Sequence, residues 1–202
     1  NVDLKELLSA IDVPASWVGL REVYEAQIPR MIRDGVPVAN SKNFTHGIMV
    51  EVLVDGQFGY YGTPVMTKQG VSNAAKEAFK QAKIASKNSL FSFDENARPP
   101  FQGQYASPFK KDSNSLSAGS INQLLLDAYN QLKVSDKIVS ASSFCQLIES
   151  TFNFVSSNGS DISQDFLMLE FDLSATAVDG SNQQTRTFGG MRGTCRQMGL
   201  EY

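Results

Sequence analysis

The chain of 202 residues is long enough for one large domain or two small ones. Hydrophobic residues make up 42% and charged residues 19% of it, a balance that supports a buried core and excludes global disorder. The net charge of -3 argues against a dedicated nucleic-acid binder, which carries a clustered basic surface, so we expect no direct contact with nucleic acid.

Targeting and redox signals are weak in this sequence. The first residues contain no basic and apolar leader, and no apolar run is long enough to cross a bilayer, so we expect neither secretion nor membrane contact. Two cysteines, Cys145 and Cys195, are too few for a disulfide scaffold. A cytoplasmic location is therefore expected.

The first half reads as a short helix, a meander of strands and a longer helix. Residues 4–11 predict the short helix, and apolar alternation from residue 15 predicts a strand in which Glu22 is the one exception. The pairs Asp34-Gly35 and Asp55-Gly56 predict tight turns. Further strands are expected at 36–40, 48–54 and 57–61, and a small-residue stripe predicts a helix over 71–85 with Thr67 as its N-cap.

The second half repeats this order of a helix followed by strands. Helical spacing predicts a helix capped by Ser117 or Ser120, with one apolar face formed by Ile121, Leu124, Leu125, Ala128 and Leu132. Alternation predicts two strands, with Phe144, Ile148, Phe152 and Phe154 on one face of the first. In the second strand the expected buried face holds Leu167, Leu169, Phe171, Leu173, Ala175 and Ala177, with Glu170 and Asp172 on the opposite face.

These patterns predict an α+β fold of two antiparallel sheet-plus-helix units joined by a long linker. The expected domains are 1–86, an α+β unit with a meander and an Ala-rich helix, and 118–202, a second α+β unit. Residues 87–117 are rich in Pro, Ser and Asn and read as the linker between them, with Phe101, Tyr105 and Phe109 as contact points.

A polar strand near the carboxyl end is the candidate binding surface. A turn at Asp179-Gly180 leads into seven residues dominated by Ser, Thr, Asn and Gln, and residues 189–193 after them are rich in glycine. Such a strand at a sheet edge can pair with an incoming peptide or another subunit, although an ordinary exposed hairpin is the simpler interpretation. The candidate peptide-binding edge consists of Ser181, Asn182, Gln183, Gln184, Thr185, Arg186 and Thr187.

No catalytic constellation is visible in the sequence. His46 is the only histidine, and with two distant cysteines it makes a poor ligand set for zinc, so a solvated or hydrogen-bonded residue at a strand start is the favoured interpretation. Cys145 falls within an alternating strand and is expected to be buried and inert. Asp165, Glu170 and Asp172 lie near one another in the chain, and Glu170 and Asp172, on one strand face, suit the polar side of a half-buried sheet better than a glycosidase pair.

Several segments taken together resemble the TldD/PmbA family. Residues 47–63, Gly-Ile-Met-Val-Glu-Val-Leu-Val-Asp-Gly-Gln-Phe-Gly-Tyr-Tyr-Gly-Thr, are similar to its amino-terminal signature, and the Ala-rich helix follows as it does in the family. Residues 107–109, 154–159 and 175–180 resemble its later segments. The pattern departs at Glu51, where the family often has Arg, and residues 91–104 have no firm match.

The resemblance implies a cytoplasmic zinc metallopeptidase of two subunits that processes peptides or degrades unfolded polypeptide. Its His-Glu-x-x-x-His motif lies downstream of the region seen here, so no catalytic or metal residue is carried over and the chain is expected to be inactive alone. Zinc and a family-related partner subunit, in a homodimer or heterodimer, are implied for the full-length protein. The expected role of this chain is to shape the substrate chamber and the subunit interface. The alternative is a stand-alone protein-binding or scaffold module that uses exposed sheet edges.

Overall fold

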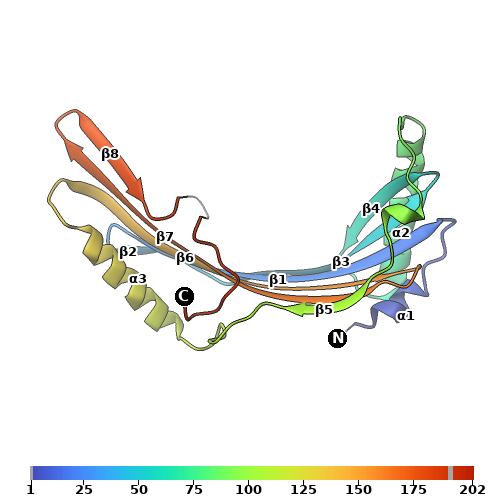
Figure 1. The fold of residues 1–202 in the computed structure, drawn as a ribbon, viewed down its shortest axis with the longest axis horizontal. Helices are drawn as coiled ribbons and strands as arrows, with labels where there is room; N and C mark the ends of the chain where they lie inside the picture. Colours follow the sequence, from blue (N-terminus) through green and yellow to red (C-terminus); the bar gives the residue numbers. More distant parts are fainter. Residues whose placement is uncertain (1, 191–192) are drawn as a thin grey trace. The chain divides into compact units, whose positions relative to one another are not determined.

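A computed structural model describes residues 2–190 and 193–202, so two residues of the glycine-rich segment, 191–192, lie outside it. Within the described residues, eight strands form one antiparallel sheet in the order β4-β3-β1-β6-β7-β5, with β2 paired to β1 and β8 paired to β7 (Figure 1). Three α-helices accompany these strands in the described part of the chain. The predicted α+β class with antiparallel pairing is confirmed.

Several strands are longer than the sequence pattern predicts. Their bounds are β1 Trp17–Arg33, β2 Val36–Asn40, β3 Asn43–Val54, β4 Gln57–Thr63, β5 Gln102–Ala106, β6 Ile138–Ser156, β7 Asp161–Asp179 and β8 Asn182–Thr187. Asp34 and Gly35, at φ 50° and 82°, join β1 to β2, and Asp55 and Gly56, at 50° and 74°, join β3 to β4. Both predicted two-residue turns are therefore present, with the positive φ values that such hairpins require.

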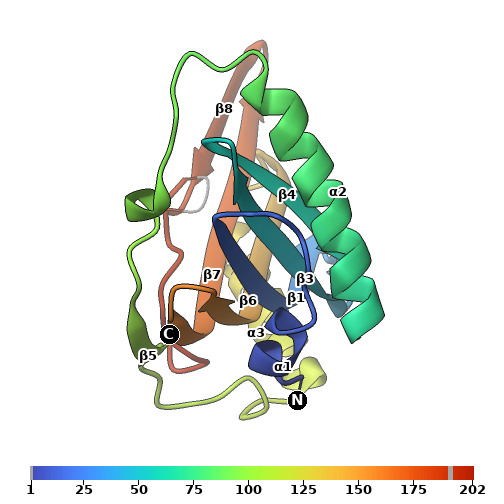
Figure 2. The same cartoon turned by 90° about the vertical axis from the view of Figure 1, so that its right-hand side faces the viewer.

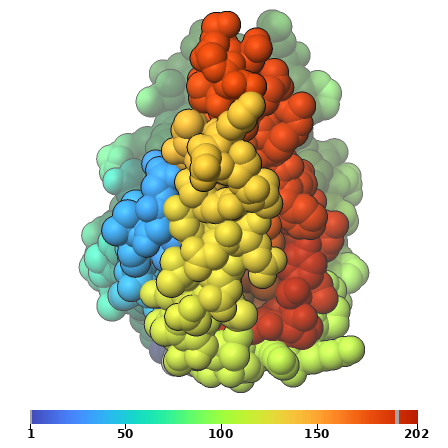
Figure 3. Space-filling model, turned by 90° about the vertical axis from the view of Figure 1, so that its left-hand side faces the viewer, coloured from blue at the N-terminus to red at the C-terminus, as the bar shows by residue number. Residues whose placement is uncertain are grey.

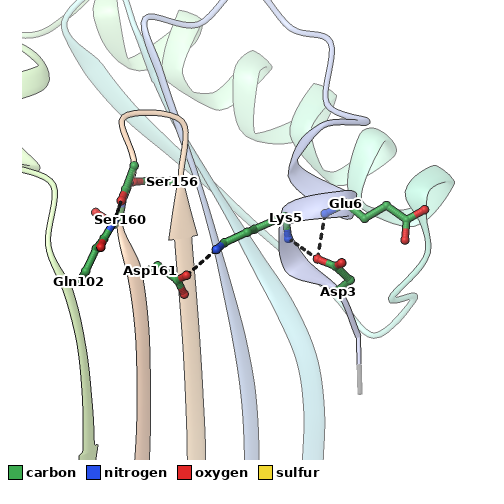
Figure 4. A network of polar contacts seen from close by, with 8 residues as sticks. Asp3, Lys5, Glu6, Gln102, Ser156, Ser160 and Asp161 are labelled. Atoms are coloured by element: carbon green, nitrogen blue, oxygen red, sulfur yellow. Dashed lines mark hydrogen bonds and ion pairs between the residues drawn. The ribbon is translucent and has the colours of Figure 1, made fainter.

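The helices start close to the predicted residues, and the cap is present at both places where the sequence predicts one. They are α1 Leu4–Leu8, α2 Lys68–Ser86 and α3 Ala118–Leu132. Thr67 Oγ1 accepts a hydrogen bond from the Gly70 amide at 3.2 Å, and Ser117 Oγ accepts one from the Ser120 amide at 3.0 Å. Asp3 caps α1, and Lys5 of this helix forms an ion pair with Asp161 at 2.6 Å (Figure 4). No helix of the described residues is long and apolar enough to cross a membrane.

Contacts divide the chain into two compact units whose segments are interleaved. Unit 1 contains Asn1–Glu25, Thr45–Tyr105 and Ser150–Asp165, and unit 2 contains Ala26–Phe44, Ala106–Glu149 and Phe166–Tyr202. This differs from the contiguous ranges expected from the sequence, because β1, β6 and β7 each contribute residues to both units. The expected linker also holds structure of its own, a 3-10 helix Glu95–Ala97 and strand β5.

The core of unit 1 lies between α2 and one sheet face. Figure 2 shows α2 lying across β3 and β4. Alternate residues of β3 from Ile48 to Val54 are nearly fully buried there and pack against small residues of α2, as their period of two predicts. The buried helix residues are Gly70, Val71, Ala74, Ala75, Ala78 and Ala82.

The core of unit 2 lies under α3, which Figure 3 shows in yellow with β2 in blue and the C-terminal segment in red beside it. Leu125 and Tyr129 of α3 are buried against Ile32, Ala141 and Cys145. The predicted helix face is correct at Leu125 but wrong at Leu124, which is 58% exposed.

Two predicted strand faces need correction. In the first half of β6 the buried residues are Ala141, Ser143, Cys145 and Leu147, not Phe144 and Ile148. The reason is that α3 packs on that face, where Ser143 Oγ donates to the Leu125 carbonyl at 2.6 Å. In β7, Leu167 and Leu169 are buried as predicted.

The expectation that Glu170 is more exposed than Phe171 is wrong. Glu170 is 9% exposed and Phe171 is half-buried. Leu169 and Glu170, which face opposite sides of the strand, are both buried, so both faces of β7 are covered at this point.

Candidate functional site

The predicted peptide-binding edge forms the outer strand of a hairpin. β8 pairs with β7 and with no other strand of the described residues, and all six of its residues are exposed. Its register sets Ala175 opposite Arg186 and Ala177 opposite Gln184. Ser181 of the predicted set lies in the turn rather than in the strand.

The register identifies which backbone groups face outward. The Phe188 amide donates to the Leu173 carbonyl at 2.8 Å. In an antiparallel ladder hydrogen-bonded pairs alternate with pairs that are not bonded, so Arg186 and Gln184 of β8 bond to β7 as well. The intervening residues Gln183, Thr185 and Thr187 direct their N–H and C=O groups away from β7. The hydroxyls of Thr176 and Thr185 lie 2.9 Å apart, as expected for a close pair without backbone bonds. The Thr185 carbonyl already accepts a bond from the Arg186 guanidinium at 2.9 Å, so the edge is open chiefly through its amides.

His46 is held in a polar network on the sheet of unit 1. Its Nε2 lies 2.9 Å from Glu22 Oε1, its ring meets Tyr24 edge-on, and Asn153 donates to the second Glu22 oxygen at 2.9 Å. This agrees with a hydrogen-bonded histidine in a strand. It also accounts for Glu22, the one polar residue on an otherwise apolar strand face.

The described residues do not fit a zinc site. No group of three His, Cys, Asp or Glu side chains able to hold a metal occurs among them. His46 is engaged by Glu22, and burial raises the pKa of the Cys145 thiol to about 11, although Arg30 opposes the shift. A zinc ligand must be deprotonated, so Cys145 is a poor donor at neutral pH.

Two of the three β7 carboxylates considered from the sequence have hydrogen-bond partners within the sheet. Asp165 accepts a hydrogen bond from the Thr151 hydroxyl at 2.7 Å, and Asp172 accepts one from the amide of Leu173 at 2.9 Å. Glu170 and Asp172 lie two residues apart on one strand. These bonds are local structural contacts.

A cluster around Glu51 was not found from the sequence. Glu51 is 2% exposed, with Arg21 Nη2 at 3.0 Å from Oε1 and Arg98 Nη2 at 3.6 Å from Oε2. Glu51 was noted only as a departure from the family pattern. Arg21 lies 30 residues before it and Arg98 lies 47 residues after it, the latter in the expected linker, so no local signal joins them.

The fold defines a class, an α+β protein built on one antiparallel sheet. Residues 31–82 match the family model described as PmbA/TldA metallopeptidase domain 1. A comparison with curated proteins finds no match.

Solved structures share the fold at low sequence identity. One from Bacteroides thetaiotaomicron, described as a proposed modulator of DNA gyrase, matches 91% of this chain and 44% of its own, with a TM-score of 0.71 and 16% identity. A Thermotoga maritima protein with the same description matches 85% of this chain and 38% of its own, with a TM-score of 0.60 and 13% identity. TldE of Thermococcus kodakarensis matches 96% of this chain and 43% of its own, with a TM-score of 0.62 and 15% identity.

The family model thus matches about a quarter of the chain, and the solved structures, all at 16% identity or below, show a shared fold. The chain spans less than half the length of the three solved proteins.

Proposed function

We propose that this chain is the non-catalytic amino-terminal region of a TldD/PmbA-type metallopeptidase and helps to hold an extended polypeptide. The observation that carries the proposal is the outer edge of β8, where Gln183, Thr185 and Thr187 present backbone groups away from β7. An extended chain can bond to such an edge whatever its side chains, which suits an enzyme that accepts varied sequences. The metallopeptidase description of the matching family model supports a polypeptide as the ligand.

The remaining parts of the proposal follow from the family. Zinc would be held by residues outside this chain, in the full-length protein or in its partner subunit. A homodimer or heterodimer of family-related subunits would complete the substrate chamber, with part of its wall and interface contributed by this chain. The location would be cytoplasmic, without direct contact to nucleic acid or membrane.

NMR titration tests the binding role. An unstructured peptide, amidated at its carboxyl terminus, is added to the isotope-labelled chain. We expect weak binding, with a Kd of about 10⁻⁴ M or above, because half a chamber provides only some of the contacts. Amide shifts should centre on Gln183, Thr185 and Thr187.

Two outcomes would contradict the proposal. An absence of shifts at millimolar peptide would remove the binding role, and cleavage of the peptide by the purified chain would show that the chemistry lies here. A folded protein partner that binds β8 far more tightly than any peptide would instead support the scaffold alternative.

A further inference from the structure

Two arginines of unit 1 share one buried carboxylate. Val50 and Val52 of β3 face the core under α2, so Glu51 between them points to the opposite face of the sheet. There it meets Arg21 of β1 and Arg98 of the segment that precedes β5.

The charges at this place do not balance. Both guanidinium groups stay ionised, so two positive charges face one carboxylate. The side chains of Arg21 and Arg98 are 47% and 43% exposed, whereas that of Glu51 is 2% exposed. Oε2 of Glu51 accepts no hydrogen bond from the described residues, and the 3.6 Å contact with Arg98 is longer than such a bond. Arg98 Nη2 donates to the Tyr60 hydroxyl at 3.5 Å, which leaves further guanidinium N–H groups for a second acceptor.

A pocket of about 390 Å³ opens beside these arginines. Its apolar lining includes Trp17, Pro99, Phe154 and Ile162. Arg21 lies over the Phe154 ring at 5.6 Å, which orients its guanidinium along the wall. Arg98 is held similarly over Phe58 at 5.0 Å.

We propose that this pocket binds the carboxylate of an apolar carboxyl-terminal residue of a polypeptide. The arginine fork matches a carboxylate, and the excess of one positive charge matches its single negative charge. The aromatic and aliphatic walls enclose a volume that suits one apolar side chain. This goes beyond main-chain pairing at β8, because the pocket recognises a chain end, and it uses only residues of unit 1.

The tryptophan in the wall provides the readout. Trp17 is the only tryptophan of the chain and is 1% exposed, so its fluorescence reports on the pocket. The chain is titrated with N-acetylphenylalanine, with N-acetylphenylalaninamide and with a tetrapeptide ending in a free phenylalanine. We expect a saturable change with the acid and the tetrapeptide, and binding of the amide that is at least about tenfold weaker. The tetrapeptide should bind at least as tightly as the acid. An equal response to acid and amide, or no response to either, would overturn the proposal, and binding of the acid without the tetrapeptide would show a small-molecule site instead.

Matched variants assign the effect to the arginines. Arg98→Gln should weaken binding of the acid by about tenfold or more. Glu51→Gln should strengthen it, because the competing internal carboxylate is removed. Arg186→Gln in β8 should leave affinity unchanged. Unaltered binding of the acid by Arg98→Gln, or an equal loss of affinity in Arg186→Gln, would contradict the site. Because the Arg98 side chain is 43% exposed, its replacement by Gln should leave the chain folded.

Discussion

Gly59 of β4 lies directly beneath the backbone of Ala78 in α2. A Cβ built on Gly59 would lie 2.0 Å from the Ala78 carbonyl oxygen and 2.9 Å from the Ala82 nitrogen. Real Cβ atoms do not approach backbone this closely, so the absence of a side chain at Gly59 lets α2 pack on the sheet. The stripe of alanines on the buried face of α2 serves the same close approach.

Gly59→Ala should therefore destabilise unit 1. The helix must shift away from β4, and the loss in the free energy of unfolding should be about 2–4 kcal/mol, since overpacking against a rigid backbone finds no relief. Gly62→Ala is the matched control in the same strand, because its Cβ would meet only the Met49 side chain at 3.8 Å. Its stability should change by less than about 1 kcal/mol. Denaturant titration of both variants checks this, and equal stability of the two would refute the close packing of α2.

The Glu201 carboxylate should make the C-terminal segment sensitive to acid. Desolvation tends to raise its pKa, but hydrogen bonds from the amides of Lys111, Lys110 and Gly199 outweigh it and hold the pKa at about 2, below the usual 4.5. A depressed folded-state pKa stabilises the protein above pH 4.5, and this contribution is lost as the pH falls toward 2.

The melting temperature of Glu201→Gln should accordingly be lower than that of the parent chain at pH 6. The two melting temperatures should become equal as the pH falls toward 2. Glu95→Gln, which removes an exposed carboxylate elsewhere, should show no such convergence. A difference between Glu201→Gln and the parent that stays constant from pH 6 to pH 2 would contradict the role of these amides.

The two cysteines should react with thiol reagents at very different rates. Cys145 is buried with a pKa near 11, so roughly one thousandth of it is thiolate at pH 8, whereas Cys195 is partly exposed. A disulfide reagent at pH 8 should modify the Cys195 thiol first. The Cys145 thiol should react only when local or global unfolding exposes it. Cys195→Ser should abolish the fast phase. A fast phase that persists in Cys195→Ser would mean that Cys145 is accessible.

Local signals in the sequence predict much of the fold. Asp34-Gly35 and Asp55-Gly56 determine two hairpins through neighbouring residues alone, and the caps at Thr67 and Ser117 depend on amides three residues away. The buried stripe of β3 follows from a strict period of two. Each of these features is decided within one element, which is why single-sequence reasoning finds it.

Features that depend on distant segments were missed. The contiguous division of the chain fails to describe the units because β1, β6 and β7 pair across long sequence separations. Glu170 is buried next to Leu169, so both faces of β7 are covered there, and Arg98, one partner of Glu51, lies in a stretch without periodicity. At the candidate edge the polar composition predicts exposure, but which amides face outward follows only from the register with β7.

The most direct test of the account compares two substitutions at Thr185 in the peptide titration. Thr185→Pro removes an outward amide without removing a bond to β7, since Gln184 and Arg186 make the bonds to that strand. Thr185→Val keeps the amide and removes only the hydroxyl that contacts Thr176. The account predicts that Thr185→Val binds an unstructured, amidated peptide like the parent chain, while Thr185→Pro loses at least about tenfold in affinity with its hairpin intact by NMR. Equal affinity of the two variants would show that the peptide does not pair with the edge of β8.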